Sequence, residues 1–118
     1  MAFDQYLVER VEQAFRTKNI PFTEKKMMGG LIFMVHDKMC VGVDVDKKTN
    51  EDRLMVRLGT TEYEPALDQK GCREMTFTGK PMKGFVFVYP EGFDTDEDLM
   101  FWIEKAITFN KIAKSSKK

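Results

Sequence analysis

The sequence contains few of the residues that build catalytic or metal sites. Its 118 residues include two cysteines, Cys40 and Cys72, and a single histidine, His36. The cysteines lie far apart and form no CxxC pair, so we expect free thiols that act as small buried hydrophobes. A structural zinc ion needs four ligands, which is more than these residues supply. We therefore expect no metal, and we expect His36 to be a solvated turn residue.

The sequence also has no excess of charge of one sign and no long apolar run. Lysine and arginine together number 19, as do aspartate and glutamate. A balanced charge produces no long-range field toward nucleic acid or an anionic membrane, so autonomous DNA binding is not expected. No apolar run approaches the ~20 residues of a membrane helix, and the first residues, "MAFDQYLVER", do not fit a signal peptide. We expect a cytoplasmic protein that does not associate with membranes.

Two polar stretches match known ligand-binding loops only in part. In "DVDKKTNED", a calcium-loop alignment would place Thr49 where glycine is required and Lys48 at a ligand position. "TGKPMKG" has Gly-Lys but lacks the Ser or Thr and the glycine spacing of a phosphate-binding P-loop. The lone histidine has no neighbouring nucleophile to activate. We therefore expect no cofactor and no enzymatic activity.

Apolar periodicity predicts two long helices and a short one. Asp4 to about Lys18 has the stripe of an amphipathic helix, with Asp4 as its cap. Residues 62–69 favour a short helix that a Thr61–Glu64 capping box would begin. The second long helix is expected to use Asp94 as its cap and to end near Ile112.

Between the helices, period-two alternation predicts an antiparallel meander. The expected strands are Thr23–Met27, Leu31–Val35, Met39–Val45, Arg53–Leu58, Arg73–Phe77 and Phe85–Tyr89. Met39 and Val41 should share one face, with Cys40 on the other. The simplest register places Asp44 opposite Arg53, which gives that arginine a structural role.

These elements predict the fold class α+β. An antiparallel sheet of five to six strands carries the amino-terminal and carboxy-terminal long helices, and the short helix lies between strands. Residues 1–112 form a single domain, and residues 113–118, a basic stretch with little apolar content, are expected to be disordered.

Nine methionines are unusually many for this length. Met34 and Met39 fit gap-filling core positions. Met27, Met28, Met55 and Met82 instead stand beside lysine, arginine or glycine. Such methionines either form an adaptable contact for a partner or lie as apolar cover beneath lysine stems, and the sequence leaves both interpretations open.

Three ordered stretches carry a family resemblance. "EKKMMGGLIFMVHDKMCVGV", "DRLMVRLG" and "FTGKPMKGFVFVYPEGF", followed by an amphipathic helix, resemble the amino-terminal domain of the bacterial TfoX/Sxy competence regulators. The resemblance runs from Asp4 to about Phe109 and implies two helices on an antiparallel sheet. It also implies regulation of DNA-uptake genes together with an activator of the cyclic-AMP receptor type. The full regulators carry a further carboxy-terminal helical domain, so this chain resembles either a stand-alone domain or part of a longer protein.

The leading hypothesis is a non-enzymatic regulatory or protein-interaction module, acting as a monomer or a weak homodimer with a protein partner. The alternative is a domain that binds a small anionic ligand or nucleotide. Gly79 and Gly84 are expected to bracket a hairpin-like connection that holds two lysines around a methionine. If this connection folds beside the Gly29–Gly30 turn, a basic rim would surround an apolar patch. The candidate interaction surface comprises Lys26, Met27, Gly29, Gly30, Arg57, Lys80, Met82 and Lys83.

Overall fold

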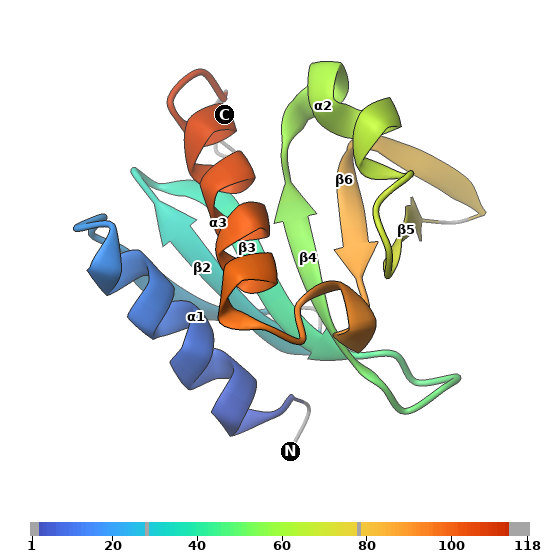
Figure 1. Ribbon diagram of the computed structural model, residues 1–118, viewed down its shortest axis with the longest axis horizontal. Helices are drawn as coiled ribbons and strands as arrows, with labels where there is room; N and C mark the ends of the chain where they lie inside the picture. Colours follow the sequence, from blue (N-terminus) through green and yellow to red (C-terminus); the bar gives the residue numbers. More distant parts are fainter. Residues whose placement is uncertain (1–2, 28, 78, 114–118) are drawn as a thin grey trace.

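The structure is a computed structural model that describes residues 3–27, 29–77 and 79–113. It confirms the α+β class, with three α-helices and a six-stranded antiparallel sheet (Figure 1). The helices are α1 (Gln5–Thr17), α2 (Gly59–Ala66) and α3 (Asp96–Asn110), and a short 3-10 helix, η1, spans Pro90–Gly92. The strands are β1 (Thr23–Met27), β2 (Gly30–Val35), β3 (Lys38–Val45), β4 (Asp52–Arg57), β5 (Cys72–Phe77) and β6 (Lys80–Val88).

The strand order is β1-β2-β3-β4-β6-β5. The first four strands form the expected meander, but the chain then places β6 beside β4 and leaves β5 at the edge of the sheet. The helix α2 connects β4 to β5 and packs against β6. This connection allows the β5–β6 hairpin to return to the sheet with its second strand inside.

The two long helices lie side by side across one face of the sheet (Figure 1). Leu7, Val11 and Phe15 of α1 and Trp102 and Ile103 of α3 are buried against apolar residues of the strands. The Trp102 indole also donates a 2.9 Å hydrogen bond to the carbonyl of Gly92, so its one polar atom is satisfied in the core. This face holds the main hydrophobic core.

The observed start of the helix agrees with the sequence prediction for one helix and differs from it for two. Asp4 caps α1 by accepting a hydrogen bond from the Tyr6 amide, as expected. The cap of α3 is Thr95, whose hydroxyl accepts from the Asp98 amide, and the prediction of Asp94 was wrong. The expected capping box of α2 was also wrong, because that helix already begins at Gly59 and has no side-chain cap.

A β-bulge decides which residues of β3 face the helices. The β2–β3 register passes from Phe33–Val41 to Met34–Met39, so Cys40 has no partner of its own. An extra residue in one strand shifts the alternation by one position. Cys40 therefore joins Val41 in the main core, while Met39 faces the other side of the sheet, contrary to the alternation expected for this strand.

The strand β6 begins five residues before the predicted start at Phe85. The stretch around Met82 is therefore part of this strand, and the expected hairpin-like connection between Gly79 and Gly84 is wrong. Gly84 lies inside the strand with a φ of +96°, a value that favours glycine. Around this glycine the β5–β6 register shifts, which bends the hairpin.

At the carboxy-terminal end, Asn110 is buried, as the sequence allowed, and donates a hydrogen bond to the carbonyl of Val35. Of the predicted tail 113–118, Ala113 is described and buried, and its carbonyl accepts a hydrogen bond from Lys38. The other five residues of that predicted tail lie outside the described residues.

Candidate functional site

The sheet face opposite the helices is covered by methionine and aromatic side chains. We call this surface the methionine face, and it consists of Met27, Ile32, Met34, Met39, Met55, Met75, Met82, Phe85 and Phe87. Within the described part of the chain, all of these side chains come from strands and none from a helix. The face thus forms a second apolar cluster, separate from the main core.

Six of the seven methionines that the structure describes belong to this face, and the seventh, Met100, packs on the main core. Ile32, Met55 and Met75 form its buried centre, and the other members are half-buried around them. Gly42 lies in the same floor, where an added Cβ would meet the Ile32 side chain at 2.8 Å. The small glycine therefore deepens the surface beside Met55.

A concavity of about 840 Å³ opens over this face. Residues of the β1–β2 turn, of β3 and β4 and their connecting loop, and of the edge strand β5 all line it. Strands from near both ends of the strand order therefore border one hollow, which shows that the sheet curves around it.

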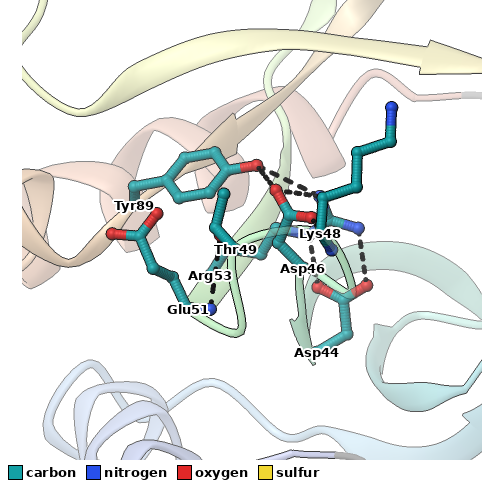
Figure 2. Close-up of polar contacts among 7 residues, drawn as sticks. All are labelled: Asp44, Asp46, Lys48, Thr49, Glu51, Arg53 and Tyr89. Carbon is teal, nitrogen blue, oxygen red and sulfur yellow. Dashed lines mark hydrogen bonds and ion pairs between the residues drawn. The ribbon is translucent and has the colours of Figure 1, made fainter.

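A cluster of polar residues, drawn in Figure 2, contributes to the lining of the concavity. Arg53 of β4 donates two hydrogen bonds, of 2.8 and 3.2 Å, to the two oxygens of Asp44 on β3. Its third nitrogen donates to the hydroxyl of Tyr89 at 3.2 Å, and its guanidinium group lies 3.6 Å from the centre of the Phe87 ring. The predicted pairing of Asp44 with Arg53 is confirmed, and Arg53 has the structural role expected of it.

The same cluster fixes the loop between β3 and β4. Tyr89 donates a 2.5 Å hydrogen bond to Asp46, and the Lys48 amide donates to the other oxygen of that carboxylate. These hydrogen bonds lower the pKa of Asp46, while burial and the bond to Asp46 raise the pKa of Tyr89. The carboxylates of Asp44 and Asp46 are thus both engaged by the protein itself.

Three cations line the concavity in addition to Arg53: Lys47, Lys48 and Arg73. The Arg73 guanidinium lies 4.2 Å from the centre of the Tyr89 ring, and the Lys48 side chain extends away from its loop in Figure 2. In the described residues, no carboxylate forms an ion pair with any of the three. Their charges are therefore available to an anionic group that enters the concavity.

The structure brings together some of the predicted surface residues. Met27 and Met82 belong to the methionine face, and Gly29 and Gly30 line the concavity. A Cβ on Gly30 would meet the Val43 carbonyl at 2.5 Å, so this position requires glycine for close approach to β3. These four residues support the part of the prediction that joins the glycine turn to the methionines.

The predicted cations lie elsewhere. Lys26 is paired with Leu31, a residue of the main core, and so belongs to the helix side of the sheet. Arg57 lies between the rings of Phe85 and Phe109, and the exposed Lys80 and Lys83 do not line the concavity. Sequence reasoning missed the cations that do line it. For Arg73 a signal existed, since it alternates with the apolar Met75 on one strand.

Both cysteines are free, as predicted. Cys40 is buried and Cys72 half-buried, and burial raises the pKa of each thiol to about 12. A thiol with so high a pKa is protonated at neutral pH and is a poor nucleophile. Among the described residues, no helix has the length and apolar character needed to cross a membrane.

Comparisons with known proteins place the chain in a family. Residues 17–110 match the TfoX N-terminal domain. A crystal structure of a Pseudomonas syringae protein from a structural genomics consortium superposes with a TM-score of 0.61 at 10% sequence identity, covering 86% of this chain and 96% of that one. At this identity the superposition shows a shared fold. No curated protein matches. Because the matched segment covers most of the chain, this protein belongs to the TfoX N-terminal domain family.

Proposed function

We propose that this protein is a non-enzymatic protein-interaction module and that the methionine face is its binding surface. The observation that carries the proposal is the placement of six of the seven described methionines on the sheet face opposite the helices. Methionine side chains are flexible and polarisable, so a surface built from them can adapt to the side chains of a partner. A hydrophobic core does not require its methionines to be concentrated on one outer face of the sheet.

The shape and charge of the surface indicate what the partner offers. A concave surface needs a convex occupant, such as a single peptide segment, rather than a flat sheet. Lys47, Lys48 and Arg73 favour acidic groups, and Met55 and Met75 favour apolar ones. The occupant that fits is a segment of another protein that combines apolar and acidic side chains.

Membership of the family supports a regulatory setting for such an interaction, and a cytoplasmic location is part of the proposal. A role of this chain in competence is part of the proposal. So is its action as a monomer or a weak homodimer. Autonomous DNA binding does not, because the chain has no net charge and three acids share the concavity with its cations.

One observation favours a second candidate function, the binding of a small anionic ligand. The concavity of about 840 Å³ falls within the range of roughly 300–1,000 Å³ that is typical of small-molecule sites. A ligand with an apolar body and a carboxylate or phosphate would use the same methionines and cations. The two candidates differ in the size of the occupant.

Methionine methyl NMR tests the proposal at the surface itself. The protein is labelled with 13C at its methionine methyl groups and titrated with short peptides that contain valine and aspartate, and with the same peptides carrying lysine in place of aspartate. We expect the methyl signals of Met27, Met55, Met75 and Met82 to shift with the acidic peptides, and that of Met100 to stay in place. Shifts caused only by small anions would favour the second candidate. Unmoved signals throughout would overturn the proposal.

A further inference from the structure

We infer that the partner segment binds in an extended conformation and adds a strand to the free edge of β5. This inference rests on the proposed function and specifies its binding mode. The strand β5 ends the strand order, and among the described elements only β6 packs extensively against it. Four consecutive β5 residues, Arg73 to Thr76, line the concavity. A chain that enters the concavity therefore meets the backbone of an edge strand.

The hydrogen bonding of β5 to β6 shows which backbone groups point outward. The Tyr89 amide donates to the Gly71 carbonyl at 2.8 Å, so Gly71 and Tyr89 form a hydrogen-bonded pair. In an antiparallel ladder such pairs alternate with pairs whose backbone groups face away from each other. Arg73 then bonds to β6, whereas the amide and carbonyl of Glu74 face outward. Consistent with this pattern, the Cys72 amide points away from β6 and donates to Gln69.

The charged side chains of β5 are held back from this edge. Arg73 lies over the Tyr89 ring, and Glu74 accepts a 3.4 Å hydrogen bond from the Tyr63 hydroxyl of α2. Both side chains are exposed, and each is oriented by a contact with a neighbouring element of the protein.

The opposite edge of the sheet is different. On β1 the three consecutive residues Glu24, Lys25 and Lys26 are all exposed. A run of charged side chains is a common device that discourages the addition of another strand to a sheet edge. Of the two edges, β5 is therefore the one suited to strand addition.

The geometry of β5 also defines a pattern for the incoming strand. Side chains directly opposite each other in neighbouring strands share a face of the sheet. Arg73 and Met75 both lie on the concave side, since one stacks on Tyr89 at the concavity and the other belongs to the methionine face. The residue opposite Arg73 should then be acidic and the residue opposite Met75 apolar, with one residue between them.

A second copy of this chain fits the edge less well. In two-fold antiparallel pairing of two β5 strands, the registers centred on Arg73 and on Glu74 place like charges directly opposite each other, which is destabilising. The register centred on Met75 places Arg73 opposite Phe77, so it also gives Arg73 no acidic partner. The partner is therefore a segment of another protein in which an acidic and an apolar residue alternate on one face.

Backbone methylation of a peptide tests the binding mode without altering the protein. The probe is a short peptide of alternating valine and threonine in which one valine is replaced by aspartate. Two versions carry N-methyl groups on alternate amides, one on each edge of the extended peptide. Methylation of the edge that faces β5 removes donors and should weaken binding about tenfold or more, whereas methylation of the other edge should leave binding unchanged. Binding is followed by the methionine methyl signals.

A protein variant provides the reciprocal experiment. Glu74→Pro removes the outward amide of β5, a position where an edge strand tolerates proline, and should weaken peptide binding by a similar factor. Glu74→Thr keeps the amide and should bind as the wild type does. If Glu74→Pro fails to fold, the methylated peptides still decide the question.

The outcomes separate the inference from the proposed function. Equal binding of both methylated peptides, with the methionine signals still shifting, would overturn strand addition and leave the interaction surface in place. Peptide-induced dimerisation, seen as a doubled mass in sedimentation, would overturn the assignment of the edge to another protein. A peptide series that moves no methionine signal would overturn both the binding mode and the proposed function.

Discussion

Arg53 joins two strands and a loop through one guanidinium group. It bonds to Asp44 and Tyr89, lies 3.6 Å from Asp46 and stacks on Phe87, and its side chain is 17% exposed. Arg53→Ala would leave two half-buried carboxylates facing each other without a cation. We expect a loss of about 2–4 kcal/mol in the free energy of unfolding, measured by urea denaturation.

Arg53→Lys distinguishes the geometry of this group from its charge. Lysine keeps the positive charge but lacks the planar fork that binds both oxygens of Asp44. We expect the free energy of unfolding of Arg53→Lys to lie between that of the wild type and that of Arg53→Ala. A lysine variant as stable as the wild type would show that charge alone holds the cluster.

Glu24 makes stability depend on pH. A hydrogen bond with Glu12, with partial desolvation and the charge of Glu12, raises its pKa from 4.5 to about 7, although Arg16 opposes the shift. The folded state therefore holds a proton that the unfolded state has released, and the contribution of Glu24 to stability declines as the pH rises from 4.5 to about 7. Glu24→Gln should remove this decline and be more stable than the wild type above pH 7.

Urea denaturation between pH 4 and pH 8 measures the effect. The control is Glu9→Gln, which changes an exposed glutamate of α1. The control should follow the wild-type profile. Parallel profiles for Glu24→Gln and the wild type would show that Glu24 and Glu12 do not share a proton in the folded protein.

The start of α3 illustrates how neighbouring polar residues compete for one cap. Thr95 accepts from the Asp98 amide, whereas Asp94 contributes its backbone carbonyl to Arg10. Thr95→Ala should cost about 1 kcal/mol in the free energy of unfolding, as the loss of an N-cap usually does. Asp94→Ala is the matched control and should have little effect. If Asp94→Ala were less stable than Thr95→Ala in thermal denaturation, Asp94 would be the cap of α3, as the sequence predicted.

Elements with a strong local pattern were predictable from the sequence. The stripe of α1 and the alternation of β4 follow from periodicity, and the Asp44–Arg53 pairing follows from the simplest register across the β3–β4 loop. The structure confirms all three. The bulge at Cys40 and the edge position of β5 depend on how distant strands meet, and no local pattern encodes them.

The candidate site was predictable only in part for the same reason. Met27 and Met82 are distant in sequence but both stand beside glycine or lysine, which marked them as unusual. Their meeting with Met75 requires the β5–β6 hairpin to bend around Gly84. The cations of the concavity come from that hairpin and from the β3–β4 loop, so their proximity is a property of the folded sheet.

Across the whole molecule, one sheet serves two apolar clusters of different character. On the helix side, Phe15 and Trp102 fill a core enclosed by α1 and α3. On the other side, Met55 and Met75 are buried beneath half-buried methionines and aromatic rings. The first cluster supplies rigidity, and the second supplies a surface that can adapt without disturbing the fold.

The charges around this surface provide the last prediction. Lys48 and Arg73 line the concavity, whereas Lys80 and Lys83 are exposed on β6 outside it. Reversing the first pair, with Lys48→Glu and Arg73→Glu, should abolish binding of the acidic peptide and favour its lysine-containing twin. Reversing the second pair, with Lys80→Glu and Lys83→Glu, is the matched control and should leave the preference for the acidic peptide in place.

The Lys80 and Lys83 variant should keep the free energy of unfolding within about 0.5 kcal/mol of the wild type for each exposed charge. The Lys48 and Arg73 variant should lose about 1 kcal/mol, because Arg73 stacks on the Tyr89 ring. Urea denaturation of both variants therefore accompanies the binding measurement. Titration calorimetry of the two peptides against the three proteins gives the preferences directly. If only the Lys80 and Lys83 variant lost binding of the acidic peptide, the acidic group of the peptide would contact the outer part of β6 and not the concavity.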